Sequence, residues 1–448
     1  MSLKNNSLKK YYLVSLGCAK NTVDSDSISA LMTNAGYLRV DRPVQAQVLI
    51  VNTCGFIEPA REESINTLLA LSRKKRRDQV LIASGCLPDR SRDRILHEVE
   101  GIDGILSTRR WMDILDLINE IQPHSKTPVY HIPESTTIGN DEHGILRASI
   151  QGGSAYLKIA DGCRRPCAFC SIPLIKGPAV SRPMETIVSE ARQLQDKGVK
   201  ELILIAQDTT DYGSDLGLTE GLAMLLDAIT NAAPHIPWIR LLYTYPGYVT
   251  DKLIETMVSH TQILPYLDIP LQHAHPDTLI RMRRPANIDW VHSTIQKMRL
   301  AMPDLALRTT FIVGYPGETE DEFQTLLEFI TELHFDHVGV FPFSFEPGTS
   351  SEKLGDPIPQ EVKLERVQRL MSLQEKISLE KNHAFIGKDM DILVEGFDNG
   401  LTIGRSYRDA PEIDGLVIAE GKAEIGSMAR VKIMGALTHD LTGILEKK

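Results

Sequence analysis

Six cysteines are the residues of this chain whose type and spacing could do chemistry, and three of them lie in one short stretch. The segment DGCRRPCAFC holds Cys163, Cys167 and Cys170 at spacings of four and three. Structural zinc sites use four ligands, often from paired C-x-x-C motifs, whereas three thiolates leave one metal position open. The stretch favours an iron–sulfur cluster with an open position, with zinc as the main alternative. Neighbouring Arg164, Arg165 and Lys176 would offset the negative charge of such a cluster.

The other three cysteines, Cys18, Cys54 and Cys86, are separated by 36 and 32 residues. Each follows a short apolar run and stands next to a glycine, which lets the backbone approach a ligand closely. If the runs are parallel strands, their carboxyl ends meet at one edge of a sheet, so the thiols can converge. A second metal or cluster site is the prediction. The alternative is three small buried residues at strand ends.

The elements that must position these thiols follow from the alternation of apolar runs and helical patterns. The first 110 residues repeat a β-α unit, which predicts a parallel doubly wound α/β sheet. Six longer β-α units between about 150 and 350 predict a closed or partial β/α barrel, and the DGCRRPCAFC segment follows its first strand. A long helix and five short β segments with glycine-rich turns then predict a small barrel of the oligonucleotide-binding kind.

Domain boundaries are predicted from the same pattern. The α/β domain with the first three cysteines covers 1–125, a linker covers 126–148, the barrel covers 149–379, and the small β barrel covers 380–448.

Composition restricts the class of protein. The chain has 448 residues and a formal charge of −10, whereas a general nucleic-acid binder is expected to carry a net positive charge. No apolar run is long enough to cross a membrane, and the first residues lack the apolar core of a signal peptide. We therefore expect a cytoplasmic protein with no membrane partner. Reduced thiols in that compartment favour metal ligation over disulfides.

The C-x-x-x-C-x-Φ-C motif after the first strand of a β/α barrel resembles the signature of radical S-adenosylmethionine (SAM) enzymes. With the LGCAKN, NTCGF and SGC contexts, and a carboxyl-terminal domain similar to TRAM, nearly the whole chain resembles the methylthiotransferases. The resemblance implies two [4Fe-4S] clusters and S-adenosyl-L-methionine as cofactors. One cluster would be held by Cys163, Cys167 and Cys170, and the other by Cys18, Cys54 and Cys86.

The same resemblance implies different roles for the two clusters. The barrel cluster would cleave SAM to a 5′-deoxyadenosyl radical, and the second cluster would carry the sulfur that is methylated and delivered. Phe169 stands where the family contacts the adenine, and Gln207, Gln272 and Arg308 at strand ends can face the barrel mouth. The alternative interpretation of Gln207, Gln272 and Arg308 is that each is an ordinary polar residue at a strand end. His273 and His275 receive no role.

The substrate distinguishes two branches of this family: one modifies an isopentenylated adenosine of transfer RNA, the other the β-carbon of an aspartate in small-subunit ribosomal protein S twelve. Residues 381–448 contain six Lys and three Arg against six Asp and five Glu, a net charge of −2, which suits a basic ribosomal protein better than RNA. The segments DIPLQHA, MRRP and SYRDAPEIDG also resemble the aspartate branch, although Arg164 and His275 depart from its usual residues.

We therefore predict a ribosomal protein substrate, a cellular electron donor and a contact with the ribosome. Transfer RNA is the alternative substrate. A non-enzymatic scaffold that binds zinc and docks on ribosomes is the remote alternative, and it is distinguishable by its iron and sulfide content.

Overall fold

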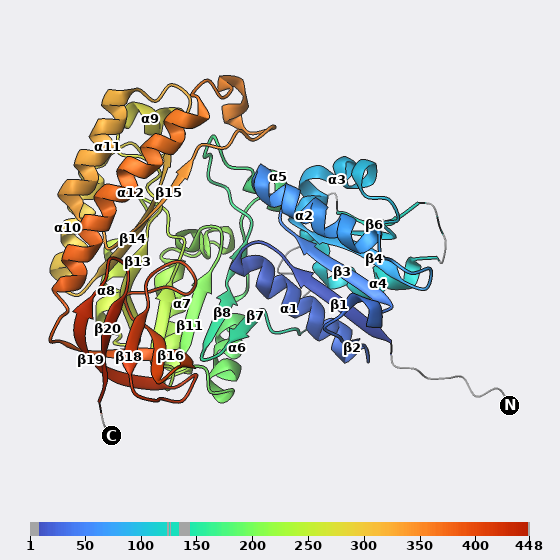
Figure 1. The fold of residues 1–448 in the computed structure, drawn as a ribbon, viewed down its shortest axis with the longest axis horizontal. Helices are drawn as coiled ribbons and strands as arrows, with labels where there is room; N and C mark the ends of the chain where they lie inside the picture. Colours follow the sequence, from blue (N-terminus) through green and yellow to red (C-terminus); the bar gives the residue numbers. More distant parts are fainter. Residues whose placement is uncertain (1–8, 123–124, 126, 134–143, 447–448) are drawn as a thin grey trace. The chain divides into compact units, whose positions relative to one another are not determined.

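The computed structural model describes residues 9–122, 125, 127–133 and 144–446. It divides into two compact units (Figure 1). The first comprises residues 1–149, 160–165 and 170–182, and the second comprises 150–159, 166–169 and 183–448. The cysteine loop therefore contributes to both units, and the small carboxyl-terminal barrel shares a unit with the large one. The first residues, which we predicted to lack a signal peptide, and part of the predicted 126–148 linker lie outside the described residues.

The first unit contains a six-stranded parallel sheet in the order β2-β1-β3-β4-β5-β6. Strands β1, β3, β4 and β5 come from the predicted β-α repeat, and the short strands β2 and β6 complete the two edges. Strand β6 lies within the 126–148 stretch that we predicted to be a linker, and it pairs with β5. The strands are β1 (Lys10–Ser15), β2 (Leu38–Arg39), β3 (Val48–Thr53), β4 (Val80–Gly85), β5 (Gly104–Ser107) and β6 (Val129–His131).

Both faces of this sheet are covered, so its central strands are continuously apolar. In β3, Val48 and Ile50 pack into one core with helices α1 (Ala19–Asn34) and α4 (Ile114–Glu120). Leu49 and Val51 point the opposite way, into a core with helices α2 (Glu58–Ser72) and α3 (Cys86–Glu98). This is the doubly wound arrangement predicted from the β-α repeats.

The second unit is built on a seven-stranded sheet in the order β15-β14-β13-β12-β11-β8-β7, whose strands from β8 to β15 are parallel. The order does not close on itself, so the predicted β/α barrel is a partial one (Figure 1). Each of the six predicted strands is present. The strands are β7 (Ala148–Gln151), β8 (Ser154–Lys158), β11 (Glu201–Ile205), β12 (Trp238–Leu241), β13 (Ile263–Asp268), β14 (Ala306–Val313) and β15 (His337–Pro342).

Amphipathic helices line the outside of the sheet. The GETEDEF segment begins α11 with a capping box between Thr319 and Glu322, as its acidic first turn predicts. The bounds are α6 (Met184–Asp196), α7 (Gly221–Ala232), α8 (Asp251–Ser259), α9 (Pro276–Arg281), α10 (Ile288–Ala301) and α11 (Glu320–Leu333).

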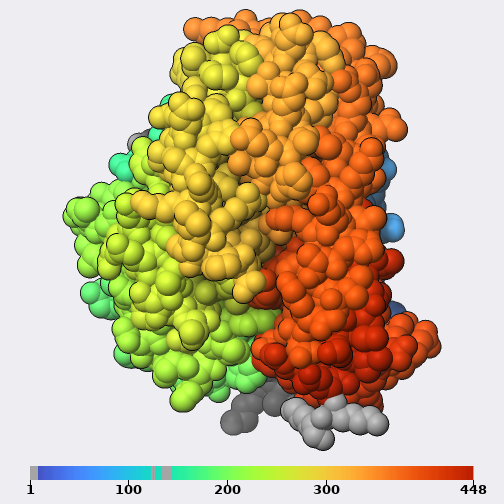
Figure 2. Space-filling view, turned by 90° about the vertical axis from the view of Figure 1, so that its left-hand side faces the viewer, coloured from blue at the N-terminus to red at the C-terminus, as the bar shows by residue number. Residues whose placement is uncertain are grey.

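Helix α12 (Gln360–His383) packs against β15 and leads into a closed five-stranded barrel (Figure 2, orange to red). The five predicted segments form this barrel, whose core includes Ile392, Val417 and Ile433. Its strands are β16 (Asp389–Asp398), β17 (Leu401–Ser406), β18 (Val417–Glu420), β19 (Met428–Ala436) and β20 (Leu441–Leu445).

A buried ionic cluster ties the two barrels of the second unit together. Glu201, at the start of β11, accepts hydrogen bonds from Arg240 (2.7 Å) and from Arg405 of β17 (2.6 Å). Arg240 also donates to the backbone oxygen of Tyr407 at 2.8 Å. Because these charges are buried and mutually compensated, the small barrel is fixed to the amino ends of the large barrel's strands.

Among the described residues, no helix combines the length and apolar character needed to cross a membrane.

Candidate active site

The first three cysteines, here called the amino-terminal triad (Cys18, Cys54 and Cys86), lie at the carboxyl ends of three adjacent strands of the first sheet. Cys18 directly precedes α1, Cys54 directly follows β3, and Cys86 is the first residue of α3. The side chain of Asn21 connects the chain segments around the triad: its Nδ2 donates to the backbone oxygens of Leu16 and Thr53 at 2.9 Å. Its Oδ1 also lies 3.5 Å from the Cys86 Sγ. The predicted convergence of the three strand ends is therefore present.

Two glycines with left-handed backbones make this close approach possible. Gly17 has φ +93°, and a Cβ there would lie 3.2 Å from the Cys54 Sγ. Gly85 has φ +94°, and a Cβ there would lie 2.4 Å from the Asn52 Oδ1. A side chain at either position would be strained, and at Gly17 it would also crowd Cys54.

The three thiols differ in environment. Cys18 is exposed, Cys54 is half-buried and Cys86 is buried. Burial raises the pKa of Cys54 and of Cys86, and the charge of Cys18 raises both further. Desolvation opposes the thiolate of Cys18 as well, but Lys20 and nearby backbone N–H groups outweigh it and lower that pKa. The charge of one thiol therefore acts on the others, which places the three sulfurs in one neighbourhood.

Lys176, the last residue of α5 (Ile172–Lys176), lies next to the start of the cysteine loop, since the N–H of Cys163 donates to the backbone oxygen of Gly177 at 3.1 Å. Its buried Nζ lies 3.1 Å from Asp161, 3.3 Å from Asp24 and 2.9 Å from the Thr108 hydroxyl. Its charge lowers the pKa of Cys18 and opposes the burial that raises the pKa of Cys86. Lys176 therefore stabilises negative charge on the amino-terminal triad.

Cys163, Cys167 and Cys170, here called the barrel triad, follow β8 and the short strand β9 (Ala160–Asp161). The sulfur of Cys163 accepts a hydrogen bond from the backbone N–H of Arg165 at 3.5 Å. The sulfur of Cys167 lies 3.4 Å from Arg284 Nη1 and 3.7 Å from the Tyr245 hydroxyl. Sulfurs that face hydrogen-bond donors fit thiolates bound to an iron–sulfur cluster.

The predicted cofactor residue Phe169 lies directly before the last cysteine of the barrel triad. Its ring packs against an apolar cluster formed by Met282, Tyr315 and Phe343, with Ile312 of β14 beside it. The ring is half-buried, so one part of it is available to a ligand. Contact between Phe169 and the cofactor stays a prediction.

Gln207 and Gln272 both lie beyond the carboxyl ends of strands, as predicted. Gln207 is two residues past β11 and is half-buried. Gln272 has φ +75°, and its backbone extends the pairing beside β14. Its backbone N–H donates to the backbone oxygen of Thr310, and its backbone oxygen accepts from the N–H of Ile312, both at 2.8 Å. Their positions fit a ligand at the barrel mouth, and their contact with it stays a prediction.

Arg308 is the third residue of β14, nearer the amino end of that strand than we expected. Its guanidinium forms ion pairs with Asp268 (3.1 Å) and with Asp414 of the small barrel (3.3 Å). These charges raise its pKa despite its burial. The contacts described for Arg308 join the two barrels, and a role in cofactor binding stays a prediction.

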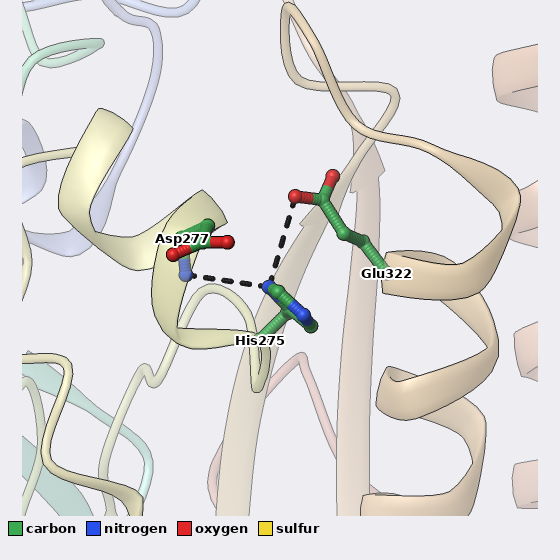
Figure 3. A group of neighbouring side chains, drawn as sticks. All are labelled: His275, Asp277 and Glu322. Carbon is green, nitrogen blue, oxygen red and sulfur yellow. Dashed lines mark hydrogen bonds and ion pairs between the residues drawn. The ribbon is translucent and has the colours of Figure 1, made fainter.

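His275, Asp277 and Glu322 form a group with possible metal ligands (Figure 3). His275 and Glu322 are already engaged in other contacts. His275 Nδ1 accepts the N–H of Asp277 at 3.3 Å and thereby caps α9. Glu322 completes the capping box of α11 and pairs with Arg281 at 2.8 Å. Helix capping therefore accounts for the positions of His275 and Glu322.

Sequence reasoning missed three residues at these sites: Asn21, Tyr245 and Arg284. Asn21 is part of the LGCAKN segment and Arg284 of MRRP, but neither was assigned a role. No local signal identifies Tyr245 or Arg284, because their partner Cys167 lies 78 and 117 residues away along the chain.

A partial β/α barrel with a three-cysteine loop after its first strand defines a radical SAM enzyme. Residues 157–330 match the Radical SAM superfamily, and residues 386–445 match the TRAM domain. Residues 10–107 match a family described as "Uncharacterized protein family UPF0004".

Full-length relatives define the family more narrowly. The chain is 44% identical to "Ribosomal protein uS12 methylthiotransferase RimO" of Herpetosiphon aurantiacus, over 97% of this chain and 99% of the relative. It is also 44% identical to the protein of that name from Microcystis aeruginosa, over 96% and 97% of the two chains. The chain belongs to the RimO family of methylthiotransferases, which are enzymes that use SAM and [4Fe-4S] clusters.

Solved structures agree with this fold. The radical SAM methyltransferase TsrM from Kitasatospora setae superposes with a TM-score of 0.57 at 12% identity, covering 88% of this chain and 79% of that one. The cobalamin-dependent SAM radical enzyme OxsB gives 0.52 at 11% identity, covering 82% and 56%.

Proposed function

We propose that this chain attaches a methylthio group to the β-carbon of an aspartate in small-subunit ribosomal protein uS12. The observation that carries the proposal is the 42–44% identity to RimO proteins over nearly the whole length. The placement of all six cysteines in two triads, with none left over, supports the same chemistry. A ribosomal substrate would place the enzyme in the cytoplasm, with a cellular electron donor.

Each triad would hold one [4Fe-4S] cluster, and SAM would bind beside the barrel triad. When bound, these groups supply the electron, the radical and the sulfur that the reaction needs. The chain's own part is to hold and orient them. Asn21 fixes the strand ends of the amino-terminal triad, and Lys176 offsets its negative charge. Phe169, Gln207 and Gln272 would position SAM at the barrel mouth.

The small barrel offers an acidic groove suited to a basic protein partner. The groove has a volume of about 910 Å³ and an apolar floor that includes Met428, Ile444 and Leu445. Four carboxylates and two cations line it: Asp391, Glu420, Glu424, Glu446, Lys422 and Arg430.

The buried charges of this domain do not change that balance. Arg405 and Arg408 point inward, to Glu201 and Asp336, but Asp409 and the side chain of Asp414 are buried as well, so the exterior keeps the net negative charge of the composition. Ribosomal proteins bind RNA phosphates and are rich in Lys and Arg, so complementarity favours this groove as their docking site.

Reversing two groove charges should weaken recognition of the ribosomal substrate. For Glu420→Lys/Glu424→Lys we expect the KM for the ribosomal protein to rise by about tenfold, since two attractive charges become repulsive. Cleavage of SAM without substrate should stay at the parental rate. Steady-state kinetics at low ionic strength, where screening is weakest, provide the measurement.

The matched control is Glu328→Lys/Glu375→Lys, which makes the same change in net charge at exposed positions of α11 and α12. Its KM should remain close to the parental value. Equal effects in the two double variants, or none in the groove variant, would rule out docking in this groove.

The function itself is tested by mass spectrometry of small-subunit ribosomal proteins and hydrolysed transfer RNA from cells with and without the gene. Loss of a methylthio mass from an aspartate of uS12 in the deleted strain is the expected result. Loss of that mass from transfer RNA instead would overturn the proposal and the charge argument behind it.

A further inference from the structure

Arg284, the third residue of the MRRP segment, is a buried cation directed at one cysteine of the barrel triad. Its Nη1 lies 3.4 Å from the Cys167 Sγ. Its guanidinium carbon lies 4.2 Å from the centre of the Tyr245 ring, and its Nη2 donates to the backbone oxygen of Pro270. Three contacts from different segments therefore fix the orientation of the guanidinium.

Within the described part of the chain, Arg284 has no carboxylate partner. Its Nε is buried and has no hydrogen-bond acceptor there. Only 9% of the residue is exposed. A buried guanidinium without an anion is unfavourable, because it loses hydration and gains no compensating charge. The compensating charge must come from what the site holds. Cys167, whose Sγ lies 3.4 Å from the guanidinium, would supply it as a thiolate bound to a cluster.

We propose that Arg284 is a positioning residue that orients Cys167 and raises the reduction potential of the cluster held by the barrel triad. The physical basis is that a fixed positive charge and a hydrogen bond to a cluster sulfur favour the reduced, more negative state. Tyr245 supports this role: its ring stacks on the guanidinium and its hydroxyl lies 3.7 Å from the same sulfur. The inference rests on the radical chemistry proposed above, but not on the identity of the substrate.

The neighbouring arginine provides an internal comparison. Arg283 is exposed, and its Nη1 donates to the Ser350 hydroxyl at 3.1 Å. Its charge is screened by solvent, so its removal should have little effect on a buried cluster.

The test is an anaerobic redox titration of the full-length protein, followed by electron paramagnetic resonance. Cys18→Ala/Cys54→Ala/Cys86→Ala serves as the parent, so that the barrel cluster alone is observed. Arg284→Gln, Arg284→Lys and Arg283→Gln are compared in this parent, each after its iron and sulfide content has been measured. No ribosomal substrate is present, so a wrong substrate assignment cannot change the readout.

For Arg284→Gln we expect the one-electron reduction equilibrium to shift at least tenfold toward the oxidised state, a potential about 59 mV more negative. Arg284→Lys should shift less, because it keeps the charge but loses the stacked, forked geometry. Arg283→Gln should match the parent. The inference is overturned if Arg284→Gln binds a full cluster at the parental potential, or if Arg283→Gln shifts it equally. It is also overturned if both Arg284 variants lose their iron while Arg283→Gln keeps it, since Arg284 would then serve assembly.

Discussion

Replacing Cys167 by alanine is expected to remove about half of the protein's iron, about four of eight atoms, and to reduce methylthiolation to background. Two thiolates cannot hold a cluster that needs three, and without it the site where SAM would bind beside Cys167 is lost. Iron and acid-labile sulfide assays on anaerobically prepared protein give the first readout. Formation of 5′-deoxyadenosine from SAM gives the second, and it should also fall to background.

The matched variant is Cys54→Ala, in the amino-terminal triad. It should lose the same amount of iron and all methylthiolation, yet still cleave SAM. The two variants therefore separate the roles of the two triads. Equal loss of SAM cleavage in both, or zinc in place of iron in the parent, would contradict the assignment and favour the scaffold alternative.

The second large effect concerns stability. Glu201→Gln should lower the free energy of unfolding of the second unit by about 3–5 kcal/mol, because it leaves Arg240 and Arg405 buried with their shared counter-charge removed. Glutamine keeps the shape and the bond to Ser154, so the loss reports charge rather than volume. Chemical denaturation followed by the fluorescence of Trp238 and Trp290 measures it.

Glu395→Gln is the control, because Glu395 also pairs with Arg405 at 2.6 Å but is 37% exposed. Water already screens this pair, so we expect a change below about 1 kcal/mol. A Glu201→Gln protein as stable as the control would refute the view that this buried cluster holds the two barrels together.

The same carboxylate predicts an acid dependence. Burial alone would raise the pKa of Glu201, but Arg240 and Arg405 outweigh it and lower the pKa to about 2 from its usual 4.5. A depressed carboxyl pKa contributes stability that is complete above pH 4.5 and is lost as the pH falls toward 2. The stability difference between the parent and Glu201→Gln should therefore shrink across that interval.

Local patterns in the sequence were sufficient to predict the architecture. Apolar runs of strand length, separated by amphipathic segments, predicted the doubly wound sheet, the six strands of the partial barrel and the five of the small barrel. These predictions succeed because burial on one or two faces makes apolar residues recur in the sequence with a pattern typical of a strand or a helix. The unpredicted strands include β2, β6 and β7, short edge strands with too few buried positions to produce such a pattern.

The six cysteines were also evident from the sequence, since type, spacing and placement after strands are local properties. What surrounds them was decided only by the tertiary structure. Arg284 lies 117 residues from Cys167 along the chain. Lys176, although close to the barrel triad in sequence, acts on Cys18 and Cys86. Arg308 pairs with Asp414 of the small barrel. The charge environment of a thiol depends on distances through space, and those distances are set only when separate elements pack together.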